Sequence, residues 1–89
     1  MRSRHKRSEG SRLFAAFVQK YHLTPTQIAG ALDTSRAIAY SWTDESKRPD
    51  AYHRAAIEVW TGGRIRVTAW LTKAEQAQLA AITPFVAAD

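Results

Sequence analysis

The side chains best suited to recognise a partner lie near the middle of the chain, on a stretch with helical spacing. Four of them would share the outward side of one helix, and these are Arg36, Ala37, Tyr40 and Ser41. A guanidinium group can form two hydrogen bonds with the edge of a guanine, and a hydroxyl can bond a base or a phosphate. Tyr40 suits a thymine methyl group or a phosphate, or alternatively partial burial against a neighbouring helix. The pattern favours contact with DNA, and Arg36 is the best candidate for reading a base.

Two short helices joined by a tight turn must position these side chains. Thr24 and Gln27 have the spacing of a capping box at the start of the first helix, and Pro25 suits its first position. Asp33 ends this helix, and Ser35 can cap the second. The inward residues of the pair would be Ile28, Ala29, Leu32, Ile38, Ala39 and Trp42. This arrangement is a helix-turn-helix.

Further helices are expected on both sides of this pair. The preceding one spans about residues 11–21, begins at the N-cap Ser11, and turns its apolar residues to the core: Leu13, Phe14, Phe17, Val18 and Tyr21. The following one begins at Asp50 and ends at the Gly62-Gly63 pair. Its inward stripe would be Ala51, Ala55, Val59 and Trp60.

A second capping box, Thr72 with Glu75, predicts a last helix near the end of the chain. This helix would carry Leu79 and Ile82 and would end before Pro84. The expected fold is therefore all-α, a compact domain of four to five helices. Residues 1–10 form a basic, disordered arm, residues 11–63 the helix-turn-helix domain, and residues 64–89 a C-terminal segment.

Length and composition limit this chain to one domain with a modest core. It has 89 residues, of which 45% are hydrophobic, and it contains no cysteine for a disulfide or a thiolate metal site. It has neither an apolar run long enough to cross a bilayer nor the apolar segment of a signal peptide. A cytoplasmic, nucleoid-associated protein is the resulting expectation.

Positive charge is concentrated at the N-terminus. The net charge is +5, and five of the 13 basic residues lie among the first twelve residues, against one of the eight acidic residues. The basic residues of the arm itself are Arg2, Arg4, Lys6 and Arg7. Such an arm can grip phosphates or the minor groove, or it can simply be a solubilising tail.

The stretch from Leu23 to Trp42 resembles the DNA-binding domain of phage lambda-type repressors and Cro proteins. The residues that carry the resemblance are Ile28, Ala29, Leu32, Ser35, Arg36, Ala39 and Trp42, followed by Lys47 and Pro49. The resemblance covers about residues 11–63. The chain departs from the pattern at three places: Asp33 replaces a glycine of the turn, Ala39 replaces a larger aliphatic residue, and Thr43 and Glu45 replace the usual Glu and Gly.

The resemblance implies that the second helix of the pair enters the major groove by its N-terminal end. Phosphates would then be contacted from the starts of both helices, by Thr24, Thr26, Gln27 and Ser35. The loop after the reading helix would add Lys47 and Arg48. The same loop carries two acidic residues, which offset part of its charge.

Enzymatic function is not expected. The three histidines, His5, His22 and His53, have no spacing that places two of them on one face as metal ligands, and the acidic residues are scattered over caps and loops. The chain also lacks a glycine-rich phosphate-binding loop. No metal or other cofactor is expected.

We therefore expect a sequence-specific DNA-binding transcriptional regulator, a repressor that binds a palindromic operator as a homodimer. Two half-sites are needed because one reading helix rarely supplies sufficient affinity. The dimer surface would come from the C-terminal segment, through Trp70, Leu71, Leu79, Ile82 and Phe85. The alternative is an antitoxin or other protein-binding module that uses the same fold to engage a toxin, RNA polymerase or another regulator. A nonspecific nucleic-acid coating protein is a third possibility.

Overall fold

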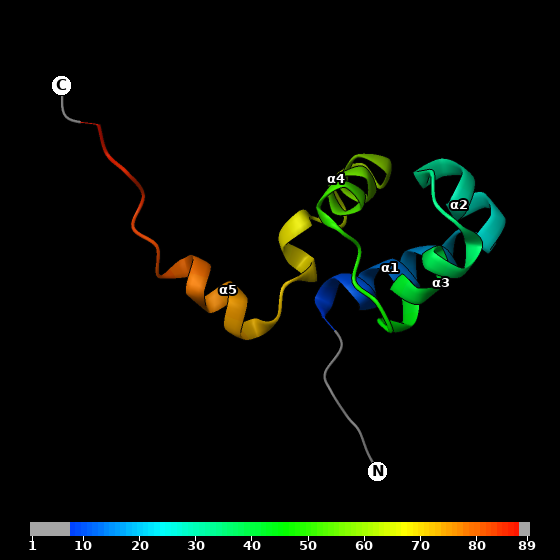
Figure 1. Ribbon diagram of the computed structural model, residues 1–89, viewed down its shortest axis with the longest axis horizontal. Helices are drawn as coiled ribbons and strands as arrows, with labels where there is room; N and C mark the ends of the chain where they lie inside the picture. The colour runs from blue at the N-terminus through cyan, green and yellow to red at the C-terminus, as the bar shows by residue number, and fades with distance from the viewer. Residues whose placement is uncertain (1–7, 88–89) are drawn as a thin grey trace, which may run out of the picture.

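The computed structural model describes residues 8–87, which form five α-helices and one 3-10 turn and contain no β-strand (Figure 1). The elements are α1 (Glu9–Lys20), α2 (Pro25–Leu32), α3 (Arg36–Asp44), α4 (Ala51–Trp60), the 3-10 turn η1 (Val67–Trp70) and α5 (Lys73–Ala80). The all-α expectation is confirmed. The basic residues Arg2, Arg4, Lys6 and Arg7 of the expected arm lie outside the described residues.

Local capping chemistry determines where four of the helices begin. The Thr24 hydroxyl accepts a hydrogen bond from the Gln27 backbone N–H at 3.1 Å, and the Gln27 side chain accepts one from the Thr24 N–H at 2.8 Å. The second expected capping box also forms, at the start of α5. Ser35 and Asp50 cap α3 and α4, each through a bond to the N–H three residues on. The cap predictions for α2 to α5 are therefore confirmed.

Helix α1 begins earlier than the sequence suggested. Ser8, rather than Ser11, is its N-cap, and the Ser8 hydroxyl accepts a bond from the Ser11 N–H at 3.1 Å. The Ser8 N–H in turn donates to the Glu45 carboxylate at 2.6 Å, which fastens the start of α1 to the end of α3. Residues 8–10 thus belong to the folded domain, and the expected boundary of the arm at residue 10 is wrong.

Three aromatic rings from distant parts of the chain form the centre of the core. Phe14 of α1 contacts Trp42 of α3, with ring centroids 6.2 Å apart, and Trp70 of η1, with centroids 6.0 Å apart. All three are at most 2% exposed. The remaining buried apolar residues of this cluster are Ile28, Leu32, Ala39, Ile57, Ile65 and Ala69.

The core does not end at Gly63. Ile65, Ala69 and Trp70 are all buried, and Trp70 packs so closely on α1 that a Cβ at Gly10 would lie 2.6 Å from its indole ring. The expected division into a domain of residues 11–63 and a separate C-terminal segment is therefore wrong. The burial of residues in this segment could not be predicted from the sequence, because residues 64–70 lack the periodicity of a long helix.

The residues that face the core on α4 and α1 differ from those expected. On α4 the core residue is Ile57, which is fully buried, whereas Val59 is 81% exposed and Ala51 and Ala55 are exposed as well. The inward side follows the spacing of His53, Ile57 and Trp60, because that side meets α2 and η1. Leu13 of α1 and Tyr21, which follows this helix as its C-cap, are 38% and 44% exposed rather than buried.

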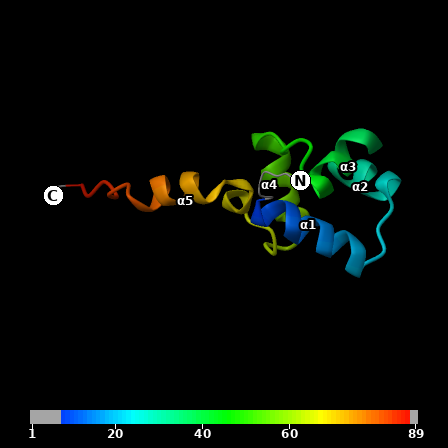
Figure 2. The same cartoon turned by 90° about the horizontal axis from the view of Figure 1, so that it is seen from below.

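Helix α5 projects from the other helices. Figures 1 and 2 show α5 and the residues that follow it running away from the body formed by α1 to α4 and η1. None of its residues is buried, and it ends at Ala80, so that Ile82 follows the helix instead of belonging to it. Its position depends on the polar contacts described below.

The contact between Gly10 and Trp70 gives a stability prediction. Gly10→Ala should destabilise the chain by about 1–3 kcal/mol, because the added methyl group must displace a buried indole. Gly30→Ala is the matched control: Gly30 lies within α2 with nothing within 4 Å of its Cβ position. The control should stabilise the chain by roughly 0.5–1 kcal/mol. Urea unfolding measures both, and equal effects of the two substitutions would contradict the packing described here.

Candidate nucleic-acid interface

Helices α2 and α3 are joined by the three residues 33–35, and the turn is made by a left-handed residue. Asp33 has φ of 55° and ψ of 60°, a conformation that Asp tolerates better than most residues. The Thr34 N–H closes the turn on the Ala29 carbonyl oxygen at 3.1 Å. Asp33 therefore supplies the left-handed residue that the turn requires, and the two helices pack directly on each other.

Three of the four expected base-reading side chains lie on the outward side of α3. Arg36, Ala37 and Tyr40 are all exposed, and Tyr40 is 60% exposed. The Ser35 hydroxyl is occupied by the Ile38 N–H at 3.1 Å, so the N–H groups of Arg36 and Ala37 remain at the tip of the helix. The positive end of the helix dipole and the Arg36 guanidinium thus share one surface, which is suited to an anionic partner.

Ser41 does not belong to this surface, and that prediction is wrong. Ser41 is 9% exposed, and its hydroxyl donates to the Ile38 carbonyl oxygen at 2.6 Å. Its backbone carbonyl oxygen accepts a hydrogen bond from the Lys47 N–H in the loop that follows α3. Ile38, which was expected to be inward, is 39% exposed instead, because the first turn of α3 extends past the edge of the core. Ile38 is therefore a surface residue that sequence reasoning missed.

At the start of α2, backbone N–H groups are more available to a partner than the side-chain groups are. Thr24, Thr26 and Gln27 are all exposed. However, the Thr24 hydroxyl and the Gln27 side-chain oxygen are both used by the capping box. The Thr26 hydroxyl and backbone N–H therefore remain as the donors best placed to meet a phosphate.

The loop after α3 separates its two basic residues. Lys47 is exposed, as expected. The Arg48 guanidinium instead donates to the Trp70 carbonyl oxygen and to the Glu75 carboxylate, both at 3.1 Å. Arg48 fastens α5 to the body, so its expected role as a phosphate contact is not supported by the structure. Its partners lie 22 and 27 residues further along the chain, which local spacing could not reveal.

The expected dimer residues fall into two groups. Trp70 is fully buried in the core of its own chain, so its inclusion was wrong, and Leu71 is half-buried. Leu79, Ile82 and Phe85 are 47%, 64% and 90% exposed. The apolar residues that remain available all belong to α5 and the segment after it.

Two carboxylates with lowered pKa values are structural groups. The His53 backbone N–H, followed by the His53 ring, lowers the pKa of the N-cap Asp50. The Thr72 backbone N–H, followed by the Arg48 guanidinium, lowers the pKa of Glu75. Each effect stabilises the ionised carboxylate at a helix start. Within residues 8–87, no three His, Asp or Glu side chains are grouped to hold a metal ion, and no helix has the length and apolar character needed to cross a membrane.

Comparison with protein-family models, with curated proteins and with solved structures found no match to this chain.

The contact between Arg48 and Glu75 predicts that the attachment of α5 depends on pH. Because the pKa of Glu75 is lowered in the folded chain, the stabilisation is complete above its ordinary pKa and is lost as the pH falls through the lowered value. The amide chemical shifts of residues 72–80 in NMR spectra should move toward unfolded positions over that acidic range. Glu75→Gln should remove this transition while the shifts of α1 to α4 stay unchanged. An unaltered transition in that variant would show that another group is responsible.

Proposed function

We propose that this chain is a sequence-specific DNA-binding transcriptional regulator in which α2 and α3 act as a helix-turn-helix. The observation that carries the proposal is the outward side of α3, where Arg36, Ala37 and Tyr40 are exposed at a helix that begins with free N–H groups. The major groove of B-DNA admits an α-helix, and the exposed side of α3 would face the bases there. The resemblance to lambda-type repressors and Cro proteins supports the same use of the pair.

We propose separate roles for the residues of this surface from their positions. Arg36 would bond the edge of a guanine, while Ala37 and Tyr40 would make close apolar contacts with neighbouring bases. The N–H groups at the starts of α2 and α3, with Thr26 and Lys47, would bond the flanking phosphates and fix the orientation of the domain. Repression would follow when an operator-bound dimer blocks access to a promoter.

A protein-binding module, such as an antitoxin, is the second candidate function. It is favoured by a hollow of about 270 Å³ with a mainly apolar lining that reaches the reading surface at Tyr40. Val18, Leu23 and Ile28 contribute to its lining, and Ile38 adds exposed apolar area on α3. This candidate predicts weak and equal binding to all duplexes, and no loss of that binding on removal of Arg36.

A gel shift on DNA from upstream of the coding region, compared with a scrambled duplex of the same length, distinguishes these candidates. The proposed function predicts clear preference for the upstream duplex at near-physiological salt. Equal affinity for both duplexes would reject operator reading and favour nonspecific coating or the protein-binding module.

Substitutions on α3 test which side of the helix reads DNA. Arg36→Ala should reduce discrimination between the two duplexes by about 1–3 kcal/mol, because it removes a paired contact with a base. Lys73→Ala, which removes the same charge from α5, should leave discrimination unchanged. Ser41→Ala should also leave it unchanged, since the Ser41 hydroxyl is bonded within its own helix. A Ser41→Ala effect as large as that of Arg36→Ala would mean that the reading side is misassigned.

A further inference from the structure

An uncharged hollow with a volume of about 270 Å³ lies where α1, α2 and α3 meet. Figure 1 shows these three helices grouped on the side of the molecule away from α5. None of the residues that line the hollow is charged, although 24% of the chain is. We call this feature the α1–α3 hollow.

The floor of the α1–α3 hollow is apolar and its rim is polar. Ile28, on the floor, is 2% exposed and belongs to the core, and Val18 and Leu23 pack against that core. Gln19 and Tyr40 also line the hollow, and both are exposed, which places them at its rim. Among residues 8–87, the Gln19 amide and the Tyr40 hydroxyl have no hydrogen-bond partner, so both can bond a ligand. An apolar concave surface with a few polar groups is the usual form of a small-molecule site.

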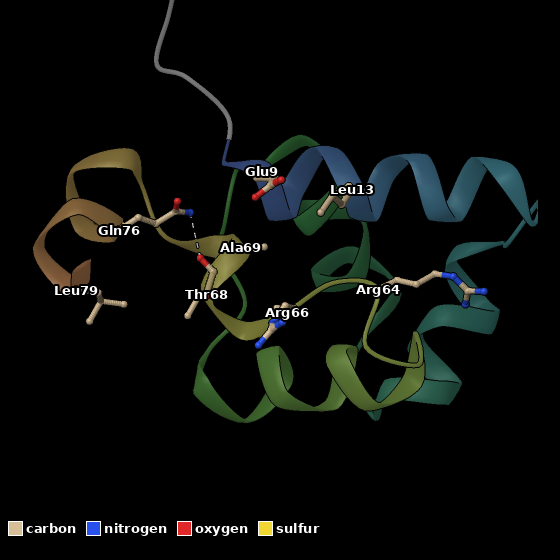
Figure 3. A pocket seen from close by; sticks show the side chains of 8 residues that line it. All are labelled: Glu9, Leu13, Arg64, Arg66, Thr68, Ala69, Gln76 and Leu79. Carbon is tan, nitrogen blue, oxygen red and sulfur yellow. Dashed lines mark hydrogen bonds between the residues drawn. The ribbon is translucent and has the colours of Figure 1, made fainter. Parts of the chain in front are cut away.

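Two other hollows of the described chain have a different chemistry. The cleft of about 390 Å³ beside α5 is lined by the charged residues Glu9, Arg64 and Arg66, among others (Figure 3). A smaller hollow of about 170 Å³ is lined in part by Lys20 and Arg64. Of these three sites, the α1–α3 hollow is therefore the one whose lining favours an uncharged molecule.

The lining and the volume define the chemical class of this molecule. A charged group placed among these side chains would lose its hydration without gaining an ionic partner, so the ligand is uncharged. A dry cavity of about 150 Å³ holds benzene, so a hollow of about 270 Å³ admits one or two fused rings. One hydroxyl or N–H group on these rings would bond the Gln19 amide or the Tyr40 hydroxyl at the rim.

We propose that the α1–α3 hollow binds a small uncharged aromatic molecule with one hydroxyl or N–H group, and that this ligand weakens DNA binding through Tyr40. The second part of the proposal rests on the proposed function. Tyr40 lines the hollow and is also exposed on the outward side of α3. A Tyr40 ring that packs over the ligand is withdrawn from the bases, so ligand and DNA compete for one side chain.

Binding of naphthol to the full chain without DNA tests the site by itself. Naphthoate is the matched control, because it has the same rings with a carboxylate in the position of the hydroxyl. In NMR titrations, naphthol should shift the amide signals of Val18, Leu23 and Tyr40, and it should bind at least about tenfold more tightly than naphthoate. Nonspecific binding to a chain of net charge +5 would favour naphthoate instead. Equal or tighter binding of naphthoate, or shifts confined to other residues, would overturn the site.

Two substitutions on α1 test where naphthol binds. Ala15 lines the hollow and is half-buried, so Ala15→Leu should fill part of the space and weaken naphthol binding at least about tenfold. Ala16→Leu is the matched control, since Ala16 is exposed and does not line the hollow. Circular dichroism should show that both variants keep their helices. Equal weakening by the two substitutions, or unchanged binding to a folded Ala15→Leu chain, would contradict the location.

Fluorescence anisotropy of a labelled upstream duplex tests the effect on DNA binding. Saturating naphthol should weaken duplex binding by the wild-type chain at least about fivefold, within the usual range of coupling between two sites. Ala15→Leu should bind the duplex like the wild type and should not respond to naphthol. Naphthol that occupies the hollow without changing the duplex affinity would overturn this effect.

The two measurements separate this inference from the proposed function. A chain that prefers the upstream duplex but binds no naphthol would overturn the site and leave the proposed function standing. A chain that binds naphthol in the hollow but binds no duplex would reject the proposed function and support the site.

Discussion

Burial of the Trp42 indole determines which way α3 faces. Trp42 lies in the last turns of α3, where Ala39 one turn earlier is too small to hold the helix against the core by itself. Its indole ring is instead fixed edge-on by Phe14, which Trp70 supports from another side. Because α3 is a rigid rod, fixing Trp42 inward turns Arg36, Ala37 and Tyr40 outward. The exposed surface of α3 is thus a consequence of packing at its opposite side.

The same cluster connects α1 and the start of α5 to the region around α3. Trp70 brings η1 against Gly10, and Arg48 then connects the Trp70 carbonyl oxygen to Glu75 at the start of α5. Glu45 at the end of α3 adopts a left-handed conformation with φ of 59°, which costs energy for a residue other than glycine. Its carboxylate offsets this cost by accepting the Ser8 N–H. The loop after α3 therefore sets the directions of both α1 and α5.

Those features that depend on neighbours in the sequence could be predicted. The capping boxes of α2 and α5, the caps Ser35 and Asp50, and the left-handed Asp33 all act within a few residues, so their residue types identify them. Features that depend on distant contacts could not be predicted. The choice of Ser8 over Ser11 depends on Glu45, and the burial of Trp70 depends on a close approach to Gly10.

The errors in the candidate site have the same origin. Ser41 and Ile38 differ from expectation because the edge of the core lies within α3. Helical spacing predicts which side of a helix faces inward, but it does not predict how far along the helix axis the core extends. Arg48 was assigned to a phosphate because its carboxylate partner lies 27 residues away. The outward positions of Arg36, Ala37 and Tyr40 were predictable, since the inward Ala39 and Trp42 fix the opposite side.

If α3 reads a DNA sequence through Arg36, selection from a pool of randomised duplexes should reveal that sequence. Repeated binding by the full chain, followed by sequencing, should enrich an inverted repeat whose half-site centres lie about 10 base pairs, one helical turn, apart. The Arg36→Ala chain, taken through the same selection, should lose a guanine at a fixed position in each half-site. Absence of any enriched sequence, or enrichment of the same repeat by both chains, would contradict the claim.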